Sequence, residues 1–588
     1  MHIIKLLAVN LLCLCLAHNG ISQTAAGDLI RINQNGFYAS GPKVAVVINT
    51  TATDFSLINT ATKEKVFTAP LKASAVWEYS NEKASKADFS KFNKPGTYVV
   101  SVNGVGESYP FIIGSQVNLP LGKAALKMYY YQRASTELTE KYAGKWARKA
   151  GHPDNEVLVH ASAATATRPA GTKISSPRGW YDAGDYNKYI VNSGISTYTL
   201  LSLYEHYPKF CDTLNTFIPE SGNNLPDLLD EVLWNLRWML TMQDQDGGVY
   251  HKLTNPNFDG SVMPHAATEA RYVVKKSTAA SLDFAAVTAQ AYRIFRNFNK
   301  QLPGFADSCL IASKSSYTWS KKNPGITYVQ SLMNASYNPD IVTGEYGDQG
   351  LDDEFQWAAM ELYISTGKFN YYDEANLKFT MNNFDLPNWA KVNTLGLYSF
   401  IKFRSELASV EEMELLKDKL IKMADSFRKN VGNSAFGVPM GLKSTDFNWG
   451  SNANAANQGV LLIQAYNLTG DKSYLDAAVA SLDYLLGRNG TGYSFFTGYG
   501  EKSTKNPHSR PSESDGIEDP VPGLLAGGPN PGMEDASNCG GKYVGKLPAT
   551  AYIDDKCSYA SNEIAINWNA PFAYLTLAIE AIKGPEKK

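Results

Sequence analysis

The sequence is poor in cysteine, which limits the kinds of site that it can contain. Six cysteines occur in 588 residues, and they are Cys13, Cys15, Cys211, Cys309, Cys539 and Cys557. No two of them have the C-x-x-C spacing of a zinc site, so we expect no cysteine-bound zinc. Cys539 and Cys557 flank one loop and could form a disulfide in an oxidising compartment, but two separate buried thiols fit the sequence equally well.

Excess charge and long apolar runs are also nearly absent. The formal net charge is only -2, so neither nucleic acid nor an anionic membrane is indicated as a partner, whereas a neutral polymer is compatible. No run of about 18 apolar residues follows the N-terminal segment, so no transmembrane helix is predicted.

The N-terminal segment has the layout of a signal peptide. A short start that contains Lys5 precedes an apolar stretch over residues 6–17, and small or polar residues follow it. Such a stretch is too short to remain in a bilayer, so residues 1–23 are predicted to be removed on export to the periplasm or the medium. Leucine, rather than a small residue, precedes Cys13 and Cys15, which disfavours a lipid anchor.

Two regions of different texture follow. Residues 28–114 contain strand-length apolar runs at intervals of about ten residues, with turn residues such as Pro95-Gly96 between them, which is typical of a small β-sandwich. Residues 122–585 are dominated by helical periodicity, as where Leu229, Leu233 and Leu236 follow Pro226. The sequence therefore predicts a β domain and then one large helical domain, but periodicity does not say how the helices are arranged.

Two acidic motifs carry the chemistry. The segment GWYDAGDYNKY at residues 179–189 places Asp182 and Asp185 three residues apart, where one carboxylate can activate a water while the other shapes its field. Glu563 is the one acidic residue between positions 558 and 574, and apolar surroundings raise a carboxyl pKa, as a proton donor requires. A capping or calcium-binding turn and a structural glutamate are the ordinary alternatives.

A third motif consists of GYGEK at residues 498–502 and NPHSRP at residues 506–511. His508 and Arg510 lie two residues apart in its Pro-bounded loop, where their donors can point at the hydroxyl groups of a ligand. Together the three motifs resemble those of glycoside hydrolase family 9, the inverting cellulases, in order and in spacing over almost the whole mature chain. The resemblance implies an immunoglobulin-like β-sandwich followed by an (α/α)6 barrel with its site in an open cleft.

The resemblance also implies roles for single residues. Asp185 matches the general base, Asp182 its supporting carboxylate and Glu563 the general acid. His508, counted with the catalytic set, and Arg510 match residues that bind the sugar beside the scissile bond.

Further positions follow from the same resemblance. Asp554 matches an acidic position that supports the catalytic geometry, and Tyr559 is expected to line the cleft. Trp180 and Trp568 lie inside the motifs and are predicted to stack on sugar rings.

No cofactor is required by this chemistry, although a structural calcium is possible. Many family members bind calcium near a Ser-Gly-x-x-Asp-Glu segment, and the nearest match here offers Gly350, Asp353 and Glu354 as oxygen ligands. Some relatives carry zinc near the positions of His152 and Asp154, but the cysteines of that site are missing, so we predict no zinc.

The resulting prediction is a secreted, monomeric endo-β-1,4-glucanase. It would cleave cellulosic, mixed-linkage or xyloglucan-type polymers in a single inverting step, with Asp185 as base and Glu563 as acid. An exo-acting β-glucosidase or glucosaminidase of the same family is an alternative, because loops that block the cleft cannot be seen in a sequence. A catalytically inactive glycan-binding protein is a second alternative, which the presence of both acids disfavours.

Overall fold

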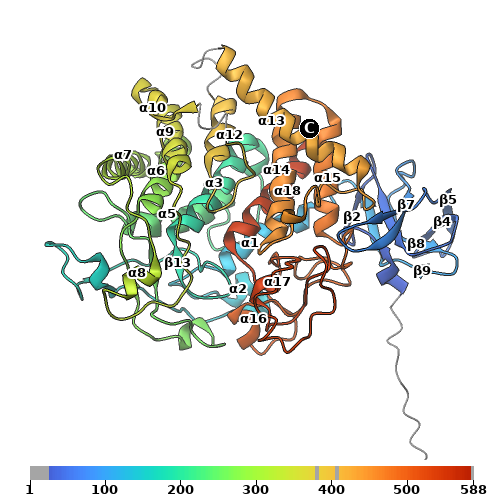
Figure 1. Cartoon of the computed structure of the whole chain (residues 1–588), viewed down its shortest axis with the longest axis horizontal. Helices are drawn as coiled ribbons and strands as arrows, with labels where there is room; N and C mark the ends of the chain where they lie inside the picture. The colour runs from blue at the N-terminus through green and yellow to red at the C-terminus, as the bar shows by residue number, and fades with distance from the viewer. Residues whose placement is uncertain (1–25, 378–382, 404–409, 585–588) are drawn as a thin grey trace, which may run out of the picture.

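The computed structural model describes residues 26–377, 383–403 and 410–584. The predicted signal peptide lies outside these ranges. Figure 1 shows a small β-sandwich beside a large helical domain, with α15 of the helical domain next to it.

The N-terminal domain consists of two sheets packed face to face. One sheet has the order β1 (Ile30–Arg31), β3 (Val44–Ile48), β7 (Glu82–Asp88) and β6 (Ala75–Trp77). The other has the order β2 (Gly36–Tyr38), β10 (Phe111–Gly114), β8 (Gly96–Val102), β4 (Asp54–Asn59) and β5 (Lys65–Pro70), with β9 (Gly106–Glu107) paired to β8. Phenylalanines from both sheets meet between them, and Phe37 packs edge-on against Phe89 and Phe111 with ring centroids 5.3 and 5.4 Å apart. This aromatic core holds the sandwich together.

The helical domain is built from helix pairs. The inner helices are α3 (Ile190–His206), α6 (Thr278–Phe295), α9 (Asp352–Thr366), α12 (Asn393–Phe403), α14 (Ser451–Thr469) and α18 (Ile566–Lys583). Their outer partners, in the same order, are α5 (Asp227–Thr241), α7 (Phe305–Lys322), α10 (Phe369–Glu374), α13 (Val410–Asn433), α15 (Lys472–Leu485) and α1 (Leu119–Tyr131). This is the paired arrangement of an (α/α)6 barrel.

The sequence patterns of the inner and outer helices follow from how much of each helix is buried. In α3 every residue from Ile190 to Leu203 is buried, as expected for a helix with neighbours on all sides. In the outer helix α13, by contrast, Leu416, Leu420 and Ala424 are buried at a spacing of four residues, and lysines and glutamates occupy many of the positions between them. α1 begins at Leu119, before the predicted start of the helical domain at residue 122, because Pro120 is tolerated in the first turn of a helix.

Short elements fill the loops at one end of the barrel. A five-stranded sheet has the order β12 (Lys173–Ile174), β11 (Val157–Val159), β15 (Tyr272–Val273), β14 (Lys252–Thr254) and β13 (Lys188–Tyr189). The short helices at this end are α2 (Glu140–Ala143), α8 (Gln330–Asn334), α16 (Arg510–Ser514) and α17 (Tyr559–Asn562), whereas α4 (Pro208–Cys211) follows the C-terminal end of α3. Cys539 and Cys557 form a disulfide with Cα atoms 5.3 Å apart, so the first of the two alternatives left open by the sequence is the one that the structure contains.

One side of the sandwich joins the core of the barrel, while the interior of the sandwich forms a hydrophobic cluster of its own. Trp77 of the sandwich packs on Phe436 with ring centroids 4.2 Å apart, and the Tyr38 hydroxyl donates to Glu580 at 2.6 Å. The Asn33 amide donates to Asp483 on α15 at 2.8 Å. Because these contacts are buried and partly polar, they fix one orientation of the sandwich on the barrel.

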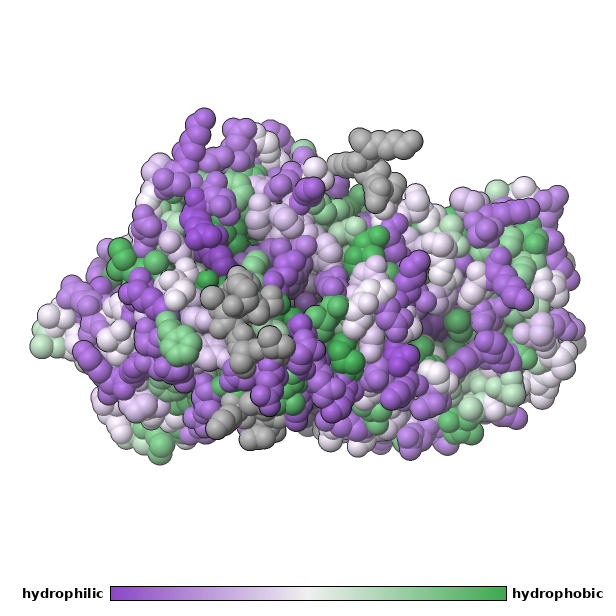
Figure 2. Space-filling model, turned by 90° about the horizontal axis from the view of Figure 1, so that it is seen from above, coloured by the Kyte–Doolittle hydropathy of each residue, from purple (hydrophilic) through white to green (hydrophobic). Residues whose placement is uncertain are grey.

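The outer surface is mostly polar. Hydrophilic side chains cover most of the face shown in Figure 2, where apolar side chains appear in small patches. Among the described residues, no helix combines the length and apolar character that crossing a membrane requires.

Candidate active site

Backbone hydrogen bonds join the three motif loops. The N–H of Ile566 donates to the carbonyl of Asp182 at 2.8 Å, and that of Arg510 to the carbonyl of Gly184 at 3.0 Å. The N–H of His508 donates to the carbonyl of Asn562 at 2.9 Å. At Gly184 a Cβ atom would lie 2.3 Å from the His508 carbonyl oxygen, so only glycine allows the loop of the aspartates and the loop of His508 to approach this closely. Segments hundreds of residues apart are thereby held in one site.

These loops border a cleft of ≈ 560 Å³. Asp182, Asp185 and Glu563 all line it. Its aromatic lining comes from Phe258, Tyr346, Trp389, Trp449 and Trp568. Acidic groups among aromatic faces suit a ligand that has both polar hydroxyl groups and flat apolar surfaces, as sugar rings have.

The two aspartates differ in their surroundings. Asp185 is 5% exposed; the Asn187 amide donates to its Oδ2, and the Tyr189 hydroxyl lies 3.5 Å from the same atom. Asp182 is 1% exposed and accepts hydrogen bonds from Asn192 at 2.9 Å and from the Tyr346 hydroxyl at 3.0 Å. Burial, and then the neighbouring Asp185 charge, raise the pKa of Asp182 to about 8. At neutral pH Asp182 is therefore mainly protonated.

Glu563 has the properties of a proton donor. Burial raises the pKa of its carboxyl well above the usual value, and the charges of Asp185 and Asp182 raise it further, against the lowering effect of Arg510. A carboxyl in such a place keeps its proton to a higher pH than an exposed glutamate does, and it can release that proton to a leaving group.

His508 and Arg510 bind the loops around the carboxylates. His508 Nδ1 lies 2.7 Å from the Lys556 carbonyl oxygen. The Arg510 guanidinium donates from Nε to the Asp259 carbonyl at 2.8 Å and from Nη1 to the Gly184 carbonyl at 3.0 Å. In this state both side chains hold backbone, so their predicted contact with sugar stays a prediction.

Asp554 and Tyr559 lie beside the cleft. Asp554 accepts the backbone N–H groups of Lys505 and Asn506, both at 2.8 Å, and so fixes the start of the His508 loop, in agreement with a supporting role. The ring of Tyr559 packs 5.4 Å from that of Trp449, which is itself a cleft residue.

Trp568 lines the cleft as expected, but the prediction for Trp180 was wrong. Trp180 is 0% exposed, and its Nε1–H donates to Glu231 at 2.9 Å, while Glu231 pairs with Arg133 at 2.9 Å. Its ring packs against Tyr129 in the core. Trp180 stands only two residues before Asp182 in the sequence, but its side chain points away from the cleft.

Sequence reasoning missed several cleft residues. Tyr346, Trp389 and Trp449 come from loops between barrel helices, and Phe258 comes from the loop after β14. Of these, Trp449 carried a weak signal, because it stands in an Asn-Trp-Gly turn directly before α14. The others have no local pattern that separates them from core aromatics.

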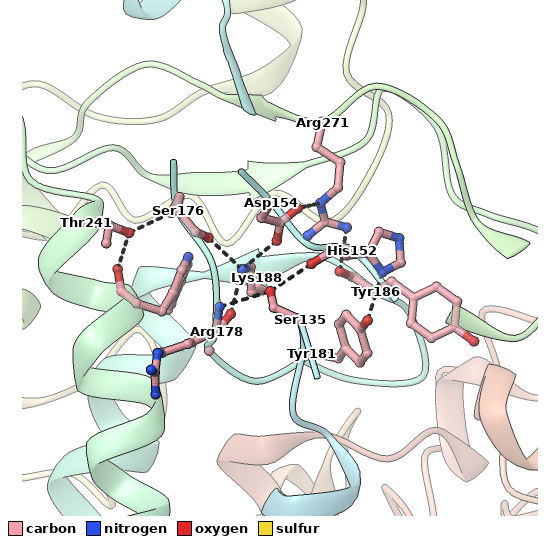
Figure 3. Close-up of polar contacts among 12 residues, drawn as sticks. Ser135, His152, Asp154, Ser176, Arg178, Tyr181, Tyr186, Lys188, Thr241 and Arg271 are labelled. Atoms are coloured by element: carbon pink, nitrogen blue, oxygen red, sulfur yellow. Dashed lines mark hydrogen bonds and ion pairs between the residues drawn. The ribbon is translucent and has the colours of Figure 1, made fainter. Parts of the chain in front are cut away.

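A buried ionic cluster supports the loop of the aspartates (Figure 3). Asp154 pairs with Lys188 at 2.7 Å and with Arg271 at 3.0 Å. Arg271 also donates to the Tyr186 carbonyl at 2.9 Å. Residues 186 and 188 lie close to Asp185 in the sequence, so Asp154 and its two cations hold the backbone next to Asp185. His152, named with Asp154 as neighbours of the zinc position, contacts the Tyr181 hydroxyl at 2.8 Å.

The predicted calcium ligands lie near further buried carboxylates. Both carboxylate oxygens of Glu354 and of Asp283 are buried without a hydrogen-bond partner, and burial raises the pKa of both groups. Gly350 donates its N–H to Asp348 at 2.9 Å, and Asp353 accepts from the Val392 N–H at 2.8 Å. Such oxygens are chemically suited to calcium, but within the described residues no group of three or more His, Cys, Asp or Glu side chains could hold a metal ion as arranged.

Comparisons with known proteins agree with this geometry. Residues 120–576 match the model of glycosyl hydrolase family 9, and residues 25–107 match the cellulase N-terminal ig-like domain. A xyloglucan-specific endo-beta-1,4-glucanase of Bacteroides ovatus is 46% identical over 559 residues, which cover 94% of each chain. Endoglucanase D of Acetivibrio thermocellus is 32% identical, over 95% of this chain and 84% of the relative. A solved family 9 structure from Bacteroides ovatus superposes with a TM-score of 0.89 at 45% identity, covering 95% of this chain and 100% of that one.

Fold and site together define a two-domain glycoside hydrolase with a carboxylate pair in an aromatic cleft. The chain belongs to glycosyl hydrolase family 9 and carries the immunoglobulin-like domain of cellulases at its N-terminal side. The predicted fold class and the predicted endo-β-1,4-glucanase activity are confirmed by these matches.

Proposed function

We propose that this enzyme cleaves internal β-1,4 bonds of xyloglucan-type polymers by single-step inversion. The observation that carries the proposal is the placement of Asp185 and Glu563 in one aromatic cleft, from motifs at opposite ends of the barrel sequence. The strong overall similarity to a xyloglucan-specific relative supports the choice of polymer.

The two acids divide the reaction between them. Asp185 accepts a proton from the water that attacks the anomeric carbon, and Glu563 donates a proton to the departing glycosidic oxygen, so the anomeric configuration inverts. Asp182, mainly protonated at neutral pH, can donate a hydrogen bond to the same water without competing for its proton. Because Glu563 must be protonated and Asp185 ionised, kcat/KM should fall at both high and low pH.

Two acid variants test the roles. Glu563→Gln should lower kcat on unactivated glucans by about 10²- to 10⁴-fold while substrate binding persists. Asp185→Ala should be similarly slow, and azide should restore part of the rate by taking the place of the activated water. Glu518→Gln, which changes an exposed acid away from the cleft, is the matched control. Wild-type rates in either acid variant would contradict the assignment.

A product time course tests the substrate and the mode of attack. Xyloglucan, mixed-linkage glucan, carboxymethylcellulose and cello-oligosaccharides are compared at equal enzyme concentration, with viscosity and reducing ends measured together. We expect a rapid loss of xyloglucan viscosity and the highest rate on that polymer. Release of monomer with little loss of viscosity would favour the exo-acting alternative, and proton NMR of the first anomer formed reports inversion directly.

Calcium, export and a monomeric state complete the proposal. The buried, donor-free oxygens of Glu354 support a calcium ion near Gly350 and Asp353. Calcium should then raise the melting temperature of the wild type but not of Glu354→Gln, and an unchanged melting temperature in chelator would count against the ion. N-terminal sequencing of the secreted protein and its mass in solution test export and the monomer.

A further inference from the structure

We propose that Asn187 is a positioning residue for the general base. Its side-chain amide holds one oxygen of Asp185 and leaves the other oxygen to receive the proton of the attacking water. The inference rests on the base role proposed for Asp185 and adds a second residue that sets the direction of that carboxylate.

The side-chain amide of Asn187 contacts Asp185 and, within the described residues, neither Asp182 nor Glu563. Asn187 is 1% exposed, and its Nδ2 donates to Oδ2 of Asp185. In the part of the chain that the structure describes, no donor contacts Oδ1 of Asp185. The Asn187 carbonyl accepts the N–H of Asp182 at 3.0 Å, so the backbone of this residue also closes the loop that carries both aspartates.

The orientation of the Asn187 amide is determined by its other contacts. Its Oδ1 accepts the backbone N–H of Asn255 at 3.0 Å and the hydroxyl of Thr254 at 2.9 Å. A flipped amide would direct its NH₂ group at the Asn255 N–H and its oxygen at the Asp185 carboxylate, and both contacts would be repulsive. The NH₂ group must therefore face Asp185.

A buried lysine begins this chain of hydrogen bonds. Burial lowers the pKa of Lys252 to about 7; in its ammonium form the side chain has only donors to offer, and its Nζ donates to the Thr343 hydroxyl at 2.9 Å. Thr343 lies 2.6 Å from the Thr254 hydroxyl, so it can pass its own hydrogen on to Thr254. The Thr254 hydrogen then has two acceptors within reach, Oδ1 of Asn187 at 2.9 Å and the Asn255 carbonyl oxygen at 2.8 Å. The backbone N–H of Asn255 has no such choice, and it fixes Oδ1 of Asn187 as an acceptor.

Several charged groups face Asp185, and Asn187 acts among them. Asp182 and Glu563 share the cleft with it, and burial raises the pKa of both, that of Asp182 to about 8. Lys252 attracts the Asp185 charge, whereas Asp259 repels it. The phenols of Tyr189 and Tyr346 complete the surroundings and stay neutral, because burial raises their pKa values.

The Asn187 amide stabilises the ionised form of the base, because an N–H donor binds a carboxylate more strongly than a carboxylic acid. Loss of this donor should therefore reduce the fraction of active enzyme at low pH. It should also release the carboxylate to rotate away from the water. Neither effect requires a change in how the polymer binds.

The experiment compares Asn187→Ala with the wild type over a pH series on soluble xyloglucan. We expect kcat to fall about 10- to 100-fold with KM nearly unchanged, and the acidic limb of the kcat/KM profile to move up by about one pH unit. Azide should not restore the rate, because the Asp185 carboxylate is still present, and this separates Asn187→Ala from Asp185→Ala.

Two further variants keep the test independent of folding. Thr254→Val leaves Asn187 in place and removes one of the two groups that hold its amide, so it should shift kcat in the same direction by about 3- to 10-fold. Asn489→Ala is the matched control, because Asn489 is also a buried amide that holds two backbone carbonyls, at 2.7 and 2.9 Å, but lies away from the cleft. It should lower the melting temperature without moving the pH profile.

The outcomes distinguish a failure of the positioning role of Asn187 from a failure of the base role of Asp185. Wild-type kcat and an unmoved acidic limb in both Asn187→Ala and Thr254→Val would overturn the positioning role, even if Asp185→Ala is inactive. An active Asp185→Ala that needs no azide would instead overturn the base assignment on which the inference rests.

Discussion

Asp154→Asn tests how strongly the ionic cluster of Figure 3 supports the loop of the aspartates. Asparagine is chosen because residue 154 has φ 50°, a conformation that asparagine tolerates better than most residues. The substitution removes one charge between Lys188 and Arg271, which are 0% and 6% exposed. Two buried cations would then face each other without a counter-ion.

The expected loss is large, because water cannot reach either cation. Breaking a buried pair by removal of one partner costs about 3–5 kcal/mol, and here one carboxylate serves two cations at 2.7 and 3.0 Å. We expect the free energy of unfolding to fall by about 3–5 kcal/mol. Asp154→Asn/Lys188→Met should recover part of this loss, since it also removes one of the unpaired charges.

The loss should depend on pH with a definite sign. Burial lowers the pKa of Lys188 to about 8, against the raising effect of Asp154. Between this value and the ordinary value of 10.5, the unfolded chain binds more protons than the folded one, so the stability of the wild type rises with pH in that window. Without Asp154 the folded pKa falls further and the rise begins at lower pH. The gap between variant and wild type should therefore narrow as the pH approaches 8.

Urea unfolding followed by tryptophan fluorescence, at several pH values, measures these differences. A loss below about 1 kcal/mol would mean that the cluster is solvated and does not support the loop. A double variant no more stable than the single one would show that Lys188 is not the cation left unpaired.

Two other changes separate structure from catalysis. Trp77→Ala should lower the free energy of unfolding by about 3–5 kcal/mol by opening the contact with Phe436, which thermal unfolding would detect; an unchanged melting temperature would show that the sandwich is not docked through this ring. Trp180→Phe should cost about 1–3 kcal/mol by leaving Glu231 without the indole donor, while KM for xyloglucan stays the same; a raised KM with unchanged stability would restore Trp180 to the cleft.

Local patterns singled out Asp182, Asp185 and Glu563, because the surroundings that their proposed roles require extend over only a few residues of the sequence. Asp182 and Asp185 must share a short loop around Gly184, where no larger residue fits, and Glu563 must stand among residues that do not neutralise it. These constraints act over a few residues and leave a visible motif.

Local patterns do not predict the direction in which a side chain points. Trp180 and Trp568 both stand within the motifs, yet Trp180 lies in the core and Trp568 lines the cleft. The difference arises from Glu231 and Tyr129, which are distant in sequence and occupy the space that receives Trp180. The residues next to Trp180 in the sequence do not indicate which distant residues it will contact.

By itself, the sequence determined the order of the two domains and the helical character of the larger one, and it singled out the three carboxylates that line the cleft, Asp182, Asp185 and Glu563. These follow from periodicity and motifs, in which each residue acts on near neighbours. Tertiary structure alone decided which aromatic residues line the cleft, that Cys539 and Cys557 are bridged, and which groups hold Asp185 in place. Packing brings these partners together from remote segments, and the low dielectric of the interior then makes their hydrogen bonds and charges strong enough to set the properties of the site.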